Sequence, residues 1–194
     1  MSDWVAAELA ACQMHDVRHT KRLARLLERL SERPVGSIPT ACHGWAETVA
    51  AYRFLHNPHI DAQEILSGHS HATLERIRAQ EIVLLVQDTP FLHYGTTHPK
   101  AGMGTVKIKT REEYLLHPTV VFTPERINLG VVGMKVWQRP EQPVAQQRKR
   151  KPIAEKESYR WLEGYQCACK IQQACPATLV MNMADRAKIS RSGW

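Results

Sequence analysis

Helical patterning dominates the first eighty residues. In one segment, Leu23, Leu26, Leu27 and Leu30 recur at helical spacing and form a single apolar stripe. Residues that cap or stop helices bound the segments, including the capping-box pair Asp61 and Glu64. We expect helices over residues 2–12, 16–32, 45–55 and 61–80.

The pattern changes at residue 82. The run Ile82–Val86 is short, apolar and β-branched, which is typical of a buried strand. Polar residues over 95–113 and 138–152 predict loops. The remaining predicted elements are strands over 115–122 and 128–137 with a turn at 123–126, a helix over 155–173 and a strand over 178–183.

This order predicts an α+β protein: an all-helical domain in residues 1–80, a mixed α/β sheet in residues 81–186 and a separate tail in residues 187–194. A right-handed crossover places the last strand parallel to an earlier one. If that neighbour is the first strand, Asp88 and Asp185 lie just past the carboxyl ends of adjacent strands. Open α/β sheets build their sites at that edge.

Composition narrows the class of protein. Of the 194 residues, 43% are hydrophobic and 23% charged, which is ordinary for a soluble globular chain. No apolar run reaches membrane-spanning length and residues 1–9 lack a signal-peptide pattern, so we expect a cytoplasmic protein without a membrane partner. The five cysteines are expected to be reduced and to have structural or incidental roles.

The net charge of +7 is unevenly placed. Residues 1–80 hold nine basic and nine acidic side chains, so the other 17 basic and 10 acidic residues carry the whole excess. Such a surplus suits a polyanionic partner, but alone it indicates nucleic acid only weakly.

A row of arginines lines the second predicted helix. Arg18, Arg22, Arg25 and Arg29 fall within a narrow stripe beside the leucines. Guanidinium groups suit phosphate because they make paired, charge-assisted hydrogen bonds. The alternative is a solvated face on which acidic neighbours, Glu28 and Glu32, neutralise the arginines, and the spacing alone favours neither interpretation.

Two aspartates each follow a predicted strand, Asp88 the first and Asp185 the last. Carboxylates at a sheet edge can bind Mg²⁺, and two such ions can activate a water and stabilise the leaving oxygen in phosphodiester cleavage. Singly, each is more often a turn-capping residue. Together, closing two strands of one sheet, they favour a metal site.

Aromatic side chains on the third predicted helix, Trp45, Tyr52 and Phe54, are expected to pack in the core, with Arg53 facing outward. The basic run 146–151 is expected to be solvated.

Histidines give no ligand pattern. His93, His98 and His117 share no spacing typical of a metal site, so we expect them to be at the surface or satisfied by hydrogen bonds.

Taken in order, several motifs resemble bacterial cut-and-paste insertion-sequence transposases with a ribonuclease-H-like DDE core. Residues 37–48, 51–55 and 57–58 resemble the N-terminal DNA-binding domain of that family, and residues 16–23 resemble its basic helix. The motifs downstream, which follow in family order to about Arg186, are Gln87-Asp88-Thr89, Leu116-His117-Pro118, Trp137-Gln138-Arg139-Pro140, Glu155-Lys156-Glu157-Ser158 and Trp161-Leu162.

The resemblance implies particular roles. Asp88 and Asp185 match the first and second metal-binding aspartates. The implied activity is Mg²⁺-dependent nicking, hairpin formation and strand transfer on double-stranded DNA, by a dimer that holds paired terminal repeats. The positions that match contacts to the transposon end are Arg18, His19, Arg22 and Arg53.

Two departures from the family pattern bear on activity. Pro90 replaces a second threonine after Asp88-Thr89 and removes one backbone donor beside the predicted metal edge. Residues 187–194 replace an acidic helical segment, so the third catalytic carboxylate and the dimerisation helices are missing. We therefore expect a truncated chain that binds ions poorly and does not catalyse transposition alone.

The leading hypothesis is thus a transposase fragment that binds transposon-end DNA. One alternative is a non-enzymatic DNA-binding regulator that occupies the transposon ends. The other is an active Mg²⁺-dependent nuclease completed by a second polypeptide.

Overall fold

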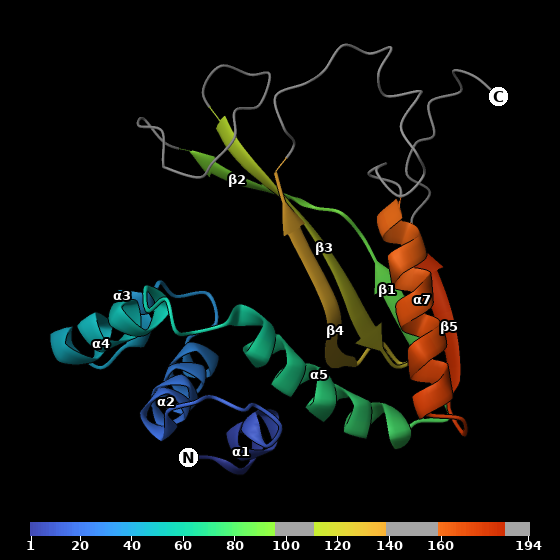
Figure 1. Ribbon diagram of the computed structural model, residues 1–194, viewed down its shortest axis with the longest axis horizontal. Coiled ribbons are helices and arrows are strands. Elements are labelled where there is room, and N and C mark those ends of the chain that lie inside the picture. Colours follow the sequence, from blue (N-terminus) through green and yellow to red (C-terminus); the bar gives the residue numbers. More distant parts are fainter. Residues whose placement is uncertain (96–110, 139–158, 185–194) are drawn as a thin grey trace. The chain divides into compact units, whose positions relative to one another are not determined.

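The computed structural model describes residues 1–95, 111–138 and 159–184 (Figure 1). The chain divides into two compact units, Met1–Glu75 and Arg76–Trp194. Helices build the first unit, and a mixed sheet with a helix builds most of the second. The predicted α+β class is confirmed.

Caps and stops place the helices close to their predicted bounds. The Asp16 side chain accepts from the Arg18 backbone N at 2.8 Å, and that of Asp61 accepts from Gln63 N at 2.8 Å, so these two predicted N-caps are present. Ser2, which was expected to cap the first helix, makes no side-chain cap bond. The helices are α1 (Asp3–Leu9), α2 (Val17–Glu32), α3 (Ile38–Ala41), α4 (Trp45–Leu55) and α5 (Ala62–Arg78). The pattern does not predict α3, because four residues are too few to show a period.

The leucine stripe of α2 forms part of the core of the first unit. Leu23 and Leu26 are buried, and Leu27 and Leu30 pack against the same cluster, as predicted. Helix α5 approaches the segment after α1 closely at Gly68, where a Cβ would lie 2.9 Å from Cβ of Cys12.

A mixed sheet organises the second unit. Its order is β2-β3-β1-β5, and β4 pairs with β3. Strand β5 is parallel to β1, with Gln87 opposite Ala184, whereas the other pairs are antiparallel. The elements are β1 (Ile82–Gln87), β2 (Phe91–Gly95), β3 (Arg111–Phe122), β4 (Asn128–Trp137), α7 (Tyr159–Ala174) and β5 (Leu179–Ala184). The last strand is therefore the parallel neighbour of the first.

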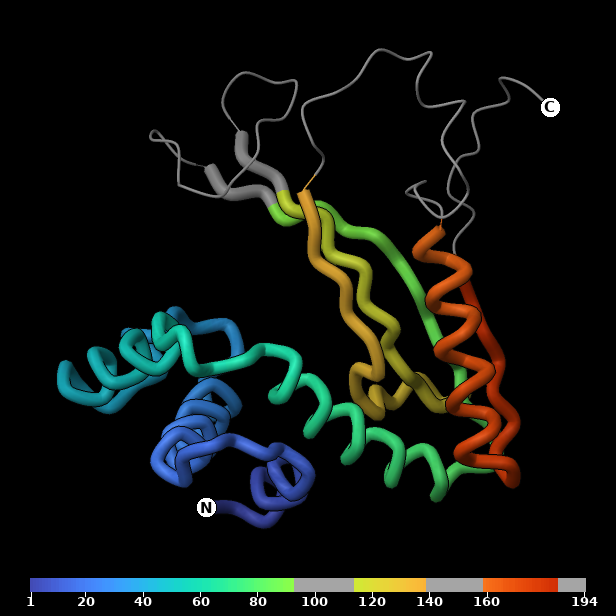
Figure 2. Tube along the Cα trace, in the orientation of Figure 1, coloured from blue at the N-terminus to red at the C-terminus, as the bar shows by residue number. Residues whose placement is uncertain are grey.

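Strands β1 and β2 lie along the same edge of β3, and the chain does not reverse between them (Figure 2). Gln87 pairs with Thr119 and Phe91 with Leu115 in one unbroken register, so Thr89 lies opposite His117. The predicted loop over 95–113 is wrong at its ends, because Gly95 and residues 111–113 belong to paired strands. Their polar composition hides this pairing.

Helix α7 packs on β1 and β5 (Figure 1). Gly164, Ala168 and Ile171 are its buried positions, and Val83 and Leu85 of β1 are fully buried. At the start of β5, the Thr178 hydroxyl donates to the carbonyl of Gln80 at 2.9 Å. Among the helices described, none is both long and apolar enough to span a membrane.

Candidate functional site

The arginines of α2 divide into two groups. Arg18 points outward, with 86% of its side chain exposed, and donates to Asp16 through Nε at 3.0 Å and Nη2 at 2.7 Å. These bonds lower the pKa of Asp16 to about 2. Within the part of the chain that the structure describes, the guanidinium of Arg22 has no hydrogen-bond or ion-pair partner.

Arg25 and Arg29 face an acidic partner on a neighbouring helix instead. Arg29 Nε donates to Glu47 of α4 at 3.1 Å with only 21% of the arginine side chain exposed, and Arg25 lies 3.8 Å from the same carboxylate. Glu47 also accepts from His43 N at 2.6 Å, and these contacts, the His43 bond foremost, lower its pKa. Arg29 therefore links α2 to α4.

Of the two acidic residues of α2 that were expected to pair with its arginines, only one does so. Glu32 pairs with Arg29 at 3.2 Å, as the spacing allows. Glu28 instead accepts from the backbone N of Ser2 at 2.7 Å, which ties α2 to the N-terminal segment.

Helix α4 presents an exposed aromatic face. Phe54 is buried at 4% exposure, as predicted, but Trp45 and Tyr52 are 81% and 42% exposed, so the predicted core packing is wrong for these two. Helix geometry explains the error, because residues seven apart share one side while Thr48, Ala51 and Phe54 occupy the other. Arg53 is exposed, as expected.

His19 is held against the end of α4. The Asn57 amide donates to His19 Nε2 at 3.1 Å, and the imidazole stands edge-on to Phe54 with ring centroids 6.5 Å apart. Its ring is therefore partly committed to packing between helices.

In the second unit, Asp88 is exposed directly after β1, and its Oδ1 accepts from Thr89 N at 2.6 Å. The residue that follows the neighbouring strand, Asp185, lies outside the described residues, as do residues 146–151, His98 and the tail 187–194. Among the side chains that are described, no three His, Cys, Asp or Glu converge as metal ligands would.

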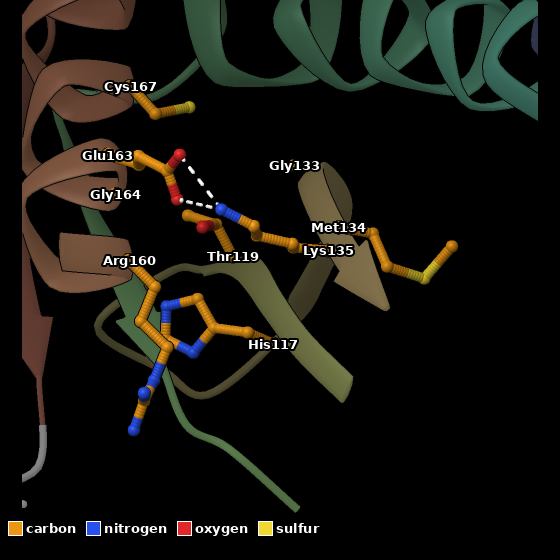
Figure 3. Close-up of a pocket in the computed structure, with 9 residues that line it drawn as sticks. All are labelled: His117, Thr119, Gly133, Met134, Lys135, Arg160, Glu163, Gly164 and Cys167. Carbon is orange, nitrogen blue, oxygen red and sulfur yellow. Dashed lines mark hydrogen bonds and ion pairs between the residues drawn. The ribbon is translucent and has the colours of Figure 1, made fainter. Parts of the chain in front are cut away.

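A cavity of about 280 Å³ opens between β3, β4 and α7 (Figure 3). Across it, Lys135 Nζ contacts both carboxylate oxygens of Glu163, at 2.9 and 2.8 Å. His117 and Arg160 line the same cavity, and Figure 3 shows the arginine side chain running alongside the imidazole.

His117 is a residue that the sequence interpretation misjudged. It is only 5% exposed, and while Nδ1 lies 2.9 Å from Thr89 Oγ1, the buried Nε2 has no partner among the described residues. The expectation of a surface or fully satisfied histidine is therefore wrong. Burial lowers the pKa of His117 and Arg160 lowers it further, whereas Asp88 and Glu163 oppose the shift.

Arg160 completes this group. Its Nε donates to Thr89 Oγ1 at 3.0 Å, and its guanidinium lies 5.5 Å from the ring centroid of Trp137 and 5.3 Å from that of Trp161. Sequence reasoning gave Arg160 no role. The only signal was its place beside Trp161 in a motif order shared with His117 and Trp137.

Comparison with known families bears on the first unit. Residues 1–60 span α1 to α4 and include Arg18, Arg22 and Arg53. This segment matches the family model described as transposase DNA-binding, which supports a transposase N-terminal DNA-binding domain at this end of the chain.

Proposed function

We propose that the chain binds double-stranded DNA at transposon ends through residues 1–60. The observation that carries the proposal is the family match over residues 1–60, which covers a helix α2 whose leucines pack inward and whose Arg18 and Arg22 remain outside the core. A guanidinium with no protein partner can bond a phosphate without first breaking an ion pair.

The arginines differ in how free they are to contact a phosphate. Arg22 and the exposed Arg53 are the first candidates for phosphate contact. Arg18 can join them once it leaves Asp16, which costs little because that pair is exposed. Arg25 and Arg29 share Glu47, so their charge is already partly neutralised within the fold.

Fluorescence anisotropy tests this proposal by measuring the affinity of the chain for a DNA duplex selected from a random pool, across a range of salt concentrations. We expect a steep fall of affinity with salt, and the log–log slope should become shallower by about 1 in Arg22→Gln and in Arg53→Gln, because each phosphate contact releases counterions. Arg126→Gln is the matched control, since it removes the same charge from an exposed turn of the second unit.

A salt-insensitive signal would count against DNA as the partner. An equal loss of slope in Arg126→Gln would show that net charge, and not the α2–α4 surface, governs binding.

A second candidate function is Mg²⁺-dependent DNA cleavage at the Asp88 edge, in the manner of a ribonuclease-H-like core. The parallel register of β1 and β5 favours it, because Gln87 pairs with Ala184 and the aspartates Asp88 and Asp185 follow these two residues directly in the sequence. The described residues supply a single carboxylate there, so any Mg²⁺ site would need Asp185 and further ligands.

Incubating the chain with labelled duplex ends and Mg²⁺ separates the candidates. Nicking that Asp88→Ala abolishes and Glu81→Ala, at the opposite end of β1, leaves intact would support a nuclease. Specific binding with no nicking would instead favour a regulator that occupies the ends.

A further inference from the structure

We propose that Thr89, His117 and Arg160 form a positioning network that fixes the carboxylate of Asp88 at the end of β1. This inference rests on the proposed metal-binding role of Asp88. It assigns a function to three residues that do not themselves need to touch metal or DNA.

The backbone explains why side chains are needed at this point. Pro90 O accepts from Leu116 N at 3.1 Å, but Pro90 has no N–H with which to return a bond. The shared register of β1 and β2 sets Pro118, which also lacks an N–H, opposite Asp88. The backbone therefore lacks a donor on either side of Thr89.

Side-chain bonds hold this segment instead. Thr89 Oγ1 accepts from Arg160 Nε at 3.0 Å and lies 2.9 Å from His117 Nδ1, while Thr89 N donates to Asp88 Oδ1 at 2.6 Å. Thr89 thus couples the two side chains to the Asp88 carboxylate. With Oδ1 oriented by Thr89, the carboxylate of the exposed Asp88 is held at the sheet edge.

The chemistry of the groups sets the direction of one of these bonds. A guanidinium only donates, so Thr89 Oγ1 accepts from Arg160 Nε. The hydroxyl keeps a second lone pair and its own proton, and either one can form the bond to His117 Nδ1. Both partners are held from inside the unit, because the His117 ring is only 5% exposed and lines the same cavity as Arg160.

Aromatic packing keeps both side chains, Arg160 and His117, in place. Arg160 lies close to the rings of both Trp137 and Trp161, and His117 stands perpendicular to Trp161 with centroids 4.8 Å apart. A network held this way resembles the outer partners that orient ligands in metal sites, whose loss weakens metal binding about 10- to 100-fold.

The test combines imidazole ¹⁵N NMR with Mn²⁺ titration of the full chain. In wild type, the ¹⁵N signal of His117 Nδ1 should report its hydrogen bond to Thr89. Thr89→Val keeps the shape but removes the hydroxyl, so the ring signals should shift and Mn²⁺ affinity should fall about 10- to 100-fold. Arg160→Gln should weaken Mn²⁺ similarly, whereas Thr89→Ser, which keeps the hydroxyl, should remain close to wild type in both measurements.

Unchanged Mn²⁺ affinity in Thr89→Val overturns the proposal even if the ring signals shift, because the bonds would then be structural only. Equal losses in Thr89→Ser and Thr89→Val overturn it as well, since the hydroxyl would not be the cause. If Asp88→Ala leaves Mn²⁺ affinity unchanged, the metal role of Asp88 fails and the positioning role with it, while DNA binding by residues 1–60 is measured separately and stands or falls on its own.

Discussion

Replacing Gly164 with alanine tests how closely α7 packs against β1, the strand that precedes Asp88. Gly164 is buried, and a Cβ at this position would overlap the carboxamide of Gln87, coming 2.6 Å from its Nε2. Gln87 has little room to retreat, because it is 1% exposed and its Nε2 donates to Asn182 Oδ1 of β5. The added methyl must displace a buried amide that bridges two strands.

Opposing terms set the size of the effect. Overpacking of a core costs about 1–3 kcal/mol, and weakening the bond from Gln87 to Asn182 adds about 0.5–1.5 kcal/mol. Alanine gains about 1 kcal/mol over glycine in helix propensity. We expect Gly164→Ala to lower the free energy of unfolding of the second unit by about 2 kcal/mol, which is roughly 30-fold in the equilibrium constant.

Hydrogen exchange of the β1 amides, followed by mass spectrometry, measures this loss where it should occur. Gln166→Ala is the control, because that residue is exposed on the same helix and should change stability by no more than about 0.5 kcal/mol. Combining Gly164→Ala with Gln87→Ala should recover part of the loss, because the clash is removed. A Gly164→Ala chain as stable as wild type, or more stable, would show that α7 does not press on Gln87.

Three further outcomes follow from the contacts. Gly68→Ala should destabilise the first unit by about 1–2 kcal/mol in urea unfolding, because the clash of the new methyl group with Cys12 outweighs the higher helix propensity of alanine. An unchanged unfolding midpoint would contradict this. NMR titration should give Asp16 a pKa of about 2, and this pKa should return toward 3.8 in Arg18→Gln. Because the folded pKa of Asp16 is lowered, its stabilising contribution is present above pH 3.8 and is lost as pH falls through about 2. The pKa of His117 is also lowered in the folded chain, so the second unit should become less stable as pH falls below about 6.5, because the unfolded chain takes up the proton first. His117→Gln should flatten this dependence of stability on pH. An identical pH dependence in the variant would refute the assignment.

Local signals were sufficient for most of the fold. Caps at Asp16 and Asp61 and the leucine stripe located two helices to within a residue or two, and the strand Asn128–Trp137 has its predicted bounds. The order of elements and the crossover rule predicted that the last strand is parallel to an earlier one, but did not decide that this neighbour is β1. Strand β2 could not be predicted this way, because its pairing with β3 depends on residues distant in sequence.

The candidate site was predictable only in part, for the same reason. Helical periodicity identified the arginine stripe of α2 but could not show that Glu47, eighteen residues beyond Arg29, turns toward it. Periodicity likewise places Trp45 and Tyr52 on one side of α4 without saying whether that side faces the core. Whether a periodic face is buried, paired or free depends on which other element reaches it.

Pro90 shows how a departure from a family pattern depends on its surroundings. Taken alone, it predicts the loss of one backbone donor beside Asp88. In the sheet, Pro118 on β3 removes a second donor from the same stretch, so the ladder is weakened on both sides of Thr89. Arg160 from α7 and His117 from β3 then bond the Thr89 hydroxyl. A backbone bond restored at residue 90 alone would therefore not replace the network, because Pro118, opposite Asp88 in the register, would still have no N–H to donate.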